Sequence, residues 1–425
     1  MKRSFLLAIF LTFFSTVLLA GAAGSFAPPA FALEQPKIPV LIDGLPVVFD
    51  VEPAIQNGRT LVPFRAIAEA LNVKVSWDGT TQTVKATDGK TSVRLQIGNR
   101  TAYRNESPLL LDVPPQILGE RTLVPLRFFS EAFNCKVDWD DAINGVRVAS
   151  PPKEMAVIGF YALGDSKTSS WTNLFGKPYP ETDKGNTGAV GELALGWYSL
   201  DKDGNLLTWS RTGWQRPDGW EKVLEAAGKY GLKTEMVVHV TDGDGTVSSL
   251  LTNEAAMSTA VKQITKEAKL YQGVNLDFEG LGYKDGGEQL KAVRDAFTRF
   301  VRLLAEQINA GGLTLTLHAP NSAYKGYDYR ALGEIADRII IMAYDYGSTP
   351  EPVNLVAQAV EMARASVPPE KLVLGISAPS ETTESILTKV GIAKRYGLGG
   401  IAIWQLGLVT AGMWDALRNT VVPER

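Results

Sequence analysis

Hydrophobic residues between positions 155 and 406 fall into eight short runs rich in β-branched and aromatic side chains. Runs of this length and composition predict buried strands, and the amphipathic stretches between them predict helices. The expected strands are 155–161, 192–200, 233–240, 273–279, 313–319, 338–345, 371–377 and 400–406. The expected helices include 220–230, 253–270, 286–309, 353–366 and 382–396. Eight strands with intervening helices over about 265 residues predict an α/β fold, a (β/α)8 TIM barrel at 155–421.

A different pattern precedes the barrel, because the chain repeats itself. RTLVPFRAIAEALNVKVSWD at 59–78 returns as RTLVPLRFFSEAFNCKVDWD at 121–140. Each copy predicts a strand that stops at a proline, a helix, and a strand that ends near a tryptophan, and two such copies bury their apolar faces against each other. We therefore expect a small duplicated α+β domain at 36–150, followed by a hinge at 150–154.

The first residues have the features of an export signal. Lys2 and Arg3 precede an apolar stretch and the cleavage-like triplet Ala30-Phe31-Ala32, which predicts a signal peptide at 1–32. No later apolar run approaches the roughly 20 residues that a membrane span needs. We expect the mature chain to be secreted, or to act in the cell envelope, without a membrane span.

Composition excludes several classes of partner. The net charge of −3 offers no basic field for nucleic acid. Only two histidines are present, His239 and His318, which argues against a histidine-based metal cluster, and we expect no cofactor. The one cysteine, Cys135, cannot form an internal disulfide and matches Val73 of the first repeat, so we expect it in a buried apolar position.

The stretch YQGVNLDFEG at 271–280 carries the candidate chemistry. Alternation along a strand places Asn275, Asp277 and Glu279 on one face and the apolar residues on the other. A solvated edge is the alternative interpretation. In a central parallel strand, however, the polar face points into the barrel, and Glu279 ends the strand where barrel enzymes carry their active sites. A carboxyl group held there is costly unless it serves function.

These residues resemble the D-G-x-D-x-D-x-E signature of the family 18 glycoside hydrolases. MAYDYG at 342–347 is similar to the M-x-Y-D motif of the sixth strand, and Trp404 matches the tryptophan of the last strand. The resemblance covers about 155–421. The stretches GVNLDFEG and LGWYSLDKDGNL are similar to the branch that includes bacterial spore cortex-lytic N-acetylglucosaminidases and related envelope proteins.

The resemblance implies the following roles. Glu279 is the general acid, with a carboxyl group that its surroundings keep protonated. Asp277 orients the 2-acetamido group of the substrate, which attacks the anomeric carbon in place of a protein nucleophile. The residues expected to contact the substrate or support this chemistry are Tyr344, Asp345, Met342, Trp404, Asn275 and Trp197, and no metal is expected.

The sequence also departs from the family pattern. Asn275 and Gln272 replace acidic positions, and the third strand reads VVHVTDGDG where many chitinases carry S-x-G-G. The connection after the seventh strand has no room for the small domain that walls the cleft of many chitinases.

Three further groups of residues have two interpretations each. Trp197, Trp209, Trp214 and Trp220, with Tyr198, either stack on sugars or pack in the core. His239 and His318 either touch substrate or fill the barrel mouth. Asp242 and Asp244 lack the further ligands of a calcium loop and predict a turn.

The N-terminal region resembles the copper amine oxidase N-terminal-like domain, a stalk on many exported bacterial proteins, through RTLVPxR and VxWD. Without histidine it has almost no copper ligands. The N-terminal domain is expected to act either as a spacer or as a module that binds the cell wall.

The leading functional hypothesis is an exported retaining glycosidase that cleaves β-1,4 bonds next to N-acetylglucosamine in peptidoglycan. Chitin oligomers are the alternative substrate, and a sugar-binding protein without activity is the alternative class. Such lectins lose the catalytic glutamate, whereas this chain keeps Glu279.

Overall fold

The computed structural model describes residues 37–162, 169–283, 285–308 and 311–425, and residues 38–425 form one compact unit. The expected signal peptide at 1–32 lies outside the described residues. No described helix has both the length and the apolar character needed to cross a bilayer.

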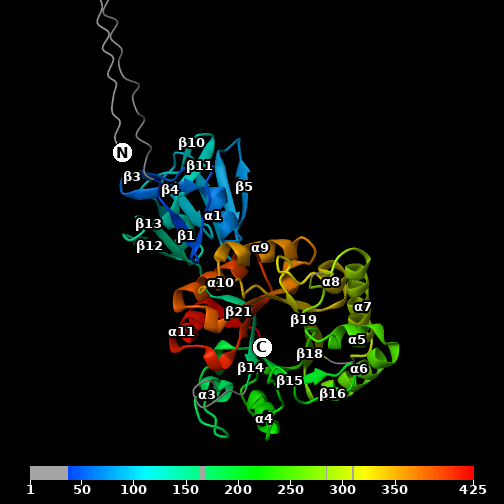
Figure 1. Cartoon of the computed structure of the whole chain (residues 1–425). Coiled ribbons are helices and arrows are strands. Elements are labelled where there is room, and N and C mark those ends of the chain that lie inside the picture. Colours follow the sequence, from blue (N-terminus) through cyan, green and yellow to red (C-terminus); the bar gives the residue numbers. More distant parts are fainter. Residues whose placement is uncertain (1–36, 163–168, 284, 309–310) are drawn as a thin grey trace, which may run out of the picture. The chain divides into compact units, whose positions relative to one another are not determined.

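Eight parallel strands close into a barrel, as the sequence predicts (Figure 1). They are β14 (Lys153–Tyr161), β15 (Glu192–Leu200), β17 (Lys233–Thr241), β18 (Gly273–Glu279), β19 (Gly312–His318), β20 (Arg338–Met342), β21 (Leu372–Ser377) and β22 (Gly400–Trp404). Each pairs with the next of these strands, and β14 pairs with both β15 and β22, which closes the ring. The short strands β16 (Leu206–Leu207) and β23 (Val421–Pro423) extend the sheet.

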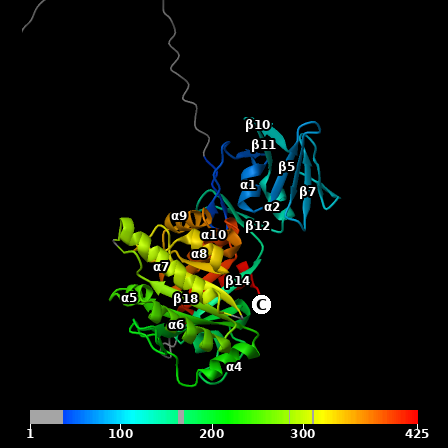
Figure 2. The same ribbon diagram turned by 90° about the vertical axis from the view of Figure 1, so that its right-hand side faces the viewer.

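Helices lie around the outside of the strands in both views of the ribbon (Figures 1 and 2). They are α3 (Ser170–Phe175), α4 (Glu221–Lys229), α5 (Thr246–Thr252), α6 (Glu254–Glu267), α7 (Gly287–Ala305), α8 (Tyr329–Ile335), α9 (Val353–Arg364), α10 (Thr383–Arg395) and α11 (Ala411–Thr420). The outward residues of the strands pack against them: the ring of Phe278 lies 5.5 Å from that of Phe300 and 5.9 Å from that of Phe297. This contact orients β18, so that the residues between its apolar positions face the barrel axis.

The connection after β21 is short, as expected. A single turn at Ala378–Ser380 leads to Thr382, whose side chain caps α10 by accepting a hydrogen bond from the backbone N–H of Ser385. No walling domain follows this strand.

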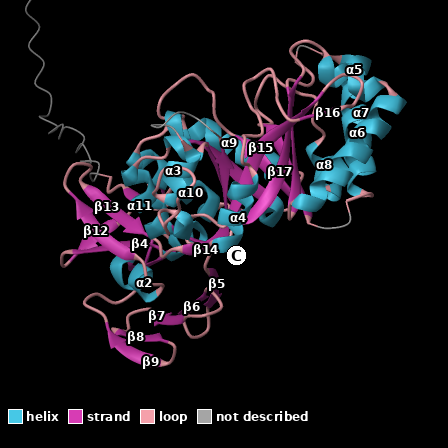
Figure 3. Cartoon of the chain, turned by 90° about the horizontal axis from the view of Figure 1, so that it is seen from below, coloured by secondary structure: helices cyan, strands magenta, loops and turns pink. Residues whose placement is uncertain are grey.

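The N-terminal domain is built from two copies of one unit, each with short strands and one small helix; Figure 3 labels several of the strands and helix α2. The first copy contains β4 (Arg59–Pro63), α1 (Phe64–Ala70), β5 (Lys74–Asp78) and β6 (Thr83–Thr87), and the second contains β11 (Arg121–Pro125), α2 (Leu126–Ala132), β12 (Lys136–Asp140) and β13 (Gly145–Ala149). The remaining strands are β1 (Val40–Ile42), β2 (Leu45–Pro46), β3 (Ala54–Gln56), β7 (Ser92–Gln96), β8 (Thr101–Arg104), β9 (Ser107–Leu110) and β10 (Gln116–Leu118).

The two copies share one core, as the repeat predicts. Strand β4 pairs antiparallel with β11, and apolar residues of both copies share one large buried cluster and a smaller one that contains Leu61 and Leu123. The arginine that opens each repeat makes an equivalent ion pair, Arg59 with Asp112 and Arg121 with Asp50. Cys135 is buried in the shared core, which confirms the expected apolar position.

Helix α10 also contacts the N-terminal residues. The Lys394 ammonium donates to the Ser150 hydroxyl at 3.0 Å, and the Arg395 guanidinium donates to the carbonyl of Pro46 at 2.8 Å. The Asn72 amide donates to the carbonyl of Lys394 at 2.6 Å. The N-terminal domain and the first residue of the expected hinge at 150–154 are therefore tied to the barrel by specific hydrogen bonds.

Candidate active site

A network of ion pairs joins β15, β17 and β20 near the N-terminal ends of these barrel strands, below the candidate active site. Arg338 donates to both carboxylate oxygens of Glu192 at 2.8 Å and to Glu235 at 2.7 Å. Glu235 is fully buried, and burial together with the charge of Glu192 raises its pKa to about 7, although Arg338 opposes that shift. This layer is not predicted from the sequence, where its only signal is a charged residue near the start of each of three expected strands.

Asn275 occupies the next layer, and its amide is fully engaged. Its N–H group donates to Glu235 at 3.2 Å, and its oxygen accepts from the Thr316 hydroxyl at 2.8 Å. The side chain is 0 % exposed. This arrangement corrects the prediction that Asn275 binds substrate: it holds the strands together beneath the site.

Asp277 lies above Asn275 on the same inner face and is also buried. Its Oδ1 atom accepts no hydrogen bond from any described residue. Burial, together with the charge of Glu279, raises the pKa of Asp277 to about 7, although His239 opposes that shift. A buried acceptor without a donor is rare in folded proteins and indicates a group that receives its partner from a ligand.

Glu279 ends the strand at the mouth of the barrel, where its side chain is 30 % exposed. One carboxylate oxygen lies 3.2 Å from Nε2 of His239, and the other lies 3.9 Å from Nε2 of His318. Burial alone would raise the pKa of Glu279, but the hydrogen bond and charge of His239, aided by the charge of His318, hold it below its usual range. The prediction that the surroundings keep Glu279 protonated is therefore wrong for the ligand-free site.

The segment after β20 brings the other predicted residues to the same mouth. Tyr344 lies close enough to Asp277 and Glu279 for burial and their charges to raise the pKa of its phenol. Asp345 has a positive φ of 64°, and its backbone N–H donates to the buried carboxylate of Glu351 at 2.9 Å. Glu351 also accepts from the N–H of the next residue and thereby fixes the turn that presents Tyr344.

Met342 and Trp404 end their strands on the same side of the barrel. Met342 is paired in register with His318 and is 7 % exposed, so its contact with substrate remains a prediction. The indole of Trp404 lies 4.8 Å from the ring of Trp214 and 5.4 Å from that of Phe160. The three rings form an apolar floor at the barrel mouth.

The tryptophans on and after β15 differ in where their rings lie: Trp214 and Trp209 are at the barrel mouth, and Trp197 is in the core. Trp214 reaches the floor because Gly196 leaves room for it: a Cβ at Gly196 would collide with the Trp214 indole. Trp209 is 53 % exposed and borders a cavity of 440 Å³ that also includes His239. Trp197 is 1 % exposed and packs edge-on against Tyr161, in the layer between barrel and helices. The prediction that Trp197 binds substrate is corrected, because its ring belongs to the core.

The expected turn at Asp242 and Asp244 is present. Asp242 accepts from the backbone N–H of Ser248, and Asp244 accepts from that of Thr246, so both carboxylates cap the start of α5.

Among the described residues, the group best placed to hold a metal ion is His239, Asp277 and Glu279, whose ligand atoms lie within 4.8 Å of one another. Hydrolysis assisted by an acetamido group needs no metal, and the expected absence of one stays a prediction.

The chain is thus a (β/α)8 barrel with a carboxyl pair on its fourth strand and an indole floor at its mouth. Residues 231–381 match the family described as glycosyl hydrolases family 18, and residues 41–148 match the copper amine oxidase N-terminal domain. The chain carries both of these domains, in the order that the sequence predicts.

Individual relatives agree with this assignment. The protein YdhD of Bacillus subtilis (strain 168), named as a sporulation-specific glycosylase, is 33 % identical over 144 residues, which cover 31 % of this chain and 32 % of YdhD. This chain thus spans about a third of the length of that relative. The crystal structure of the Bacillus cereus spore cortex-lytic enzyme SleL is similar at a TM-score of 0.54 and 17 % identity, over 71 % of this chain and 83 % of SleL. A class V chitinase from Pseudomonas fluorescens Pf-5 is similar at a TM-score of 0.51 and 20 % identity, over 62 % of this chain and 99 % of the chitinase.

The name of the N-terminal domain suggests copper, but its residues do not fit that metal. The histidines of the chain are at 239 and 318, outside the domain. The only thiol is that of Cys135, and burial raises its pKa to about 12, so it is not a thiolate at neutral pH. We derive no chemistry through copper.

Proposed function

We propose that this chain is a secreted or envelope-located retaining glycosidase that hydrolyses β-1,4 bonds next to N-acetylglucosamine in peptidoglycan. The observation that carries the proposal is the buried Oδ1 of Asp277, which lacks a donor at the bottom of the site. The N–H of a 2-acetamido group is a donor of the required kind, and a sugar without this group leaves the acceptor unpaired at a cost of about 1–3 kcal/mol.

The reaction proceeds in two steps. In the first, Glu279 gives a proton to the leaving glycosidic oxygen while the acetamido oxygen attacks the anomeric carbon from the opposite face. Asp277 accepts from the acetamido N–H and stabilises the positive charge of the oxazolinium ring that forms. Tyr344 donates to the acetamido group, and Trp404 supports the sugar from below. In the second step, Glu279 takes a proton from water, which opens the ring with retention of configuration.

Peptidoglycan is favoured over chitin by the short connection after β21. Only the five residues 378–382 lie between the end of that strand at Ser377 and the start of α10 at Thr383, so no domain stands beside the groove at this place. An open groove admits the lactyl and peptide groups that alternate along peptidoglycan. The names of YdhD and SleL point to spore substrates. Because the chain is also similar to a chitinase, chitin oligomers are the second candidate substrate.

A turnover assay on spore cortex peptidoglycan, vegetative wall and chitin oligomers tests the proposal. We expect products that end in N-acetylglucosamine from peptidoglycan, at a higher rate than from chitin oligomers, with the sugar at the new end identified by mass spectrometry. Glu254→Gln, which changes an exposed glutamate on α6, is the matched control for Glu279→Gln. The absence of turnover on all three substrates, or turnover that survives Glu279→Gln, contradicts the proposal.

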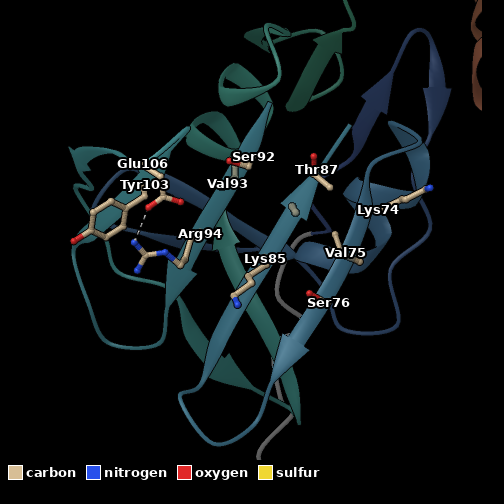
Figure 4. Close-up of a pocket in the computed structure, with 11 residues that line it drawn as sticks. Lys74, Val75, Ser76, Lys85, Thr87, Ser92, Val93, Arg94, Tyr103 and Glu106 are labelled. Carbon is tan, nitrogen blue, oxygen red and sulfur yellow. Dashed lines mark hydrogen bonds and ion pairs between the residues drawn. The ribbon is translucent and has the colours of Figure 1, made fainter. Parts of the chain in front are cut away.

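The N-terminal domain is proposed to hold the enzyme on anionic peptidoglycan through its carboxylates. Strands β5 to β8 form a concave face with a cavity of 410 Å³, which Lys74, Lys85 and Arg94 border (Figure 4). Lys85 lies directly opposite Arg94 in the strand register, an arrangement of like charges that an anionic ligand would relieve. Arg94 lies 3.5 Å from Glu106 and 3.9 Å from the centre of the Tyr103 ring. The carboxylates of the glycan's peptide stems have the complementary charge.

Co-sedimentation of the full chain with purified peptidoglycan tests this attachment. We expect Lys74→Glu/Lys85→Glu to release most of the bound protein, and 0.5 M salt to do the same, because exposed charges are screened at that ionic strength. Lys136→Glu changes the position that matches Lys74 in the second repeat and should leave binding intact. Equal binding by all the variants contradicts the assignment.

A further inference from the structure

Both histidines of the chain point at the same carboxylate. The sequence has only His239 and His318, which lie on β17 and β19, the two strands that flank β18. Their Nε2 atoms lie 3.2 Å and 3.9 Å from the two oxygens of Glu279. Only the His239 contact is short enough for a hydrogen bond. His318 instead stacks on Tyr324, with the ring centres 4.0 Å apart.

The other nitrogen of His239 has a partner that accommodates two protonation states. Nδ1 lies 3.3 Å from the hydroxyl of Thr212, and a hydroxyl can donate to a bare nitrogen or accept from an N–H. The imidazole therefore gains or loses a proton without losing this hydrogen bond. His239 is 6 % exposed, so exchange of that proton with solvent is restricted as well.

The position directly below Asp277 cannot hold a titrating proton, because an amide side chain occupies it. Asn275 stands where the family signature has an aspartate, and its amide is committed to Glu235 and Thr316. Asp277 consequently has no ionisable neighbour beneath it in the same row of side chains. A titratable group that lies beside Glu279, rather than below Asp277, is therefore the one that can hold a proton between catalytic cycles.

We propose that His239 is a positioning residue that stores the proton which Glu279 delivers to the leaving oxygen, an inference that rests on the proposed function. In the free site the imidazolium donates from Nε2 to the Glu279 carboxylate. When sugar excludes water, the ion pair loses solvation and the neutral pair is favoured, so the proton moves from Nε2 to the Glu279 oxygen. Glu279 then protonates the leaving group, later takes a proton from water, and returns it to Nε2.

The charged and titratable groups around His239 are compatible with this role. Asp277 and Glu279 face it from β18, and burial alone would lower its pKa, but the hydrogen bond to Glu279 and these two charges raise the pKa on balance. His318 behaves oppositely, since burial lowers its pKa and the charge of Glu279 only partly opposes the shift. Other titratable or charged groups near this mouth are Tyr327, Tyr344 and Asp345, and Asp201, Lys202, Arg211 and Asp244 around the adjoining cavity.

The first test compares the pH dependence of kcat for the full chain and for His239→Gln on a soluble acetamido oligosaccharide. Glutamine keeps an N–H donor near the position of Nε2 but cannot carry the extra proton. We expect kcat to fall roughly tenfold or more and the alkaline limb of the profile to move to lower pH, because Glu279 must then hold the proton alone. His318→Gln should move that limb much less, because His318 makes no hydrogen bond to Glu279 and acts on it only through its charge at 3.9 Å. An unchanged limb in His239→Gln, or an equal displacement in both variants, overturns the proposal.

The second test does not depend on turnover. With only two histidines, the ring signals of the untagged protein can be assigned by NMR with His318→Gln. We expect the titration midpoint of His239 to fall by roughly one pH unit or more in Glu279→Gln, since the paired carboxylate is lost. A midpoint that Glu279→Gln leaves in place overturns the inference. Failure of the proposed function gives a different result, namely a wild-type protein that hydrolyses no acetamido glycan while the His239 midpoint still responds to Glu279.

Discussion

Replacing Asp277 with asparagine should abolish activity and also stabilise the fold at alkaline pH. The carboxyl group is buried, its Oδ1 has no donor among the described residues, and its pKa is raised from 3.8 to about 7. Below pH 3.8 the folded and unfolded chains both hold the proton, and this group has no effect on stability. Between that pH and about 7 only the folded chain holds it, so the wild type loses stability as the pH rises.

The size of the effect follows from the same shift. At about 1.4 kcal/mol for each tenfold change in the ionisation equilibrium, the difference between 3.8 and about 7 corresponds to at most roughly 4 kcal/mol above pH 7. Asparagine has the same shape and no charge, but its amide needs partners that the site lacks, at a cost of about 1–3 kcal/mol. That cost is independent of pH. The change between pH 4 and pH 8 therefore isolates the effect of burying the charge.

Thermal unfolding of the wild type and Asp277→Asn at pH 4.5 and pH 8 measures this change. At roughly 2 °C for each kcal/mol, the midpoint of the variant relative to the wild type should be higher at pH 8 than at pH 4.5 by about 2–6 °C. Asp295→Asn, an exposed aspartate on α7 that pairs with Lys291, is the control and should show no such change. If the difference between Asp277→Asn and the wild type is the same at both pH values, the carboxylate is not held in an unfavourable environment and the reasoning is refuted.

Three other predictions concern the site and the N-terminal domain. Glu279→Gln should lower turnover by about two to four orders of magnitude with the fold intact by circular dichroism, and activity near that of the wild type would contradict its role as the acid. Tyr344→Phe should reduce kcat more than it changes KM, because its hydroxyl acts on the acetamido group during attack; a pure KM effect would argue for binding only. A chain that starts at Lys153 should keep its activity on soluble oligomers but unfold at a lower temperature, because Lys394 and Arg395 lose partners in the N-terminal domain, and loss of activity on every substrate would show that the barrel does not function alone.

The barrel could be predicted from the sequence because its strands are buried on both sides. In the run 273–279, polar residues alternate with apolar ones, so the inward face follows from the pattern together with the strand bounds. The short helices α3, α5, α8 and α11 were not among those expected. Their six to ten residues provide too few turns for a distinct apolar periodicity, and packing against the barrel stabilises them.

The site was only partly predictable, because several of its contacts join residues far apart in the sequence. The alternation around Asp277 and Glu279 identified the inner face, and the resemblance identified Tyr344 and Trp404. No local pattern indicates that His239 would reach Glu279 and lower its pKa. Likewise, no spacing rule distinguishes Trp214, which covers a glycine at the mouth, from the buried Trp197.

The configuration of the first product tests the central claim most directly. Proton NMR spectra recorded during the first minutes of hydrolysis, before mutarotation, distinguish the two anomers of the new reducing end. Hydrolysis assisted by the acetamido group predicts the β-anomer from a β-linked acetamido oligosaccharide, and no cleavage of the same oligosaccharide after removal of its acetyl groups. Release of the α-anomer, or cleavage of the deacetylated sugar at a similar rate, would contradict the account.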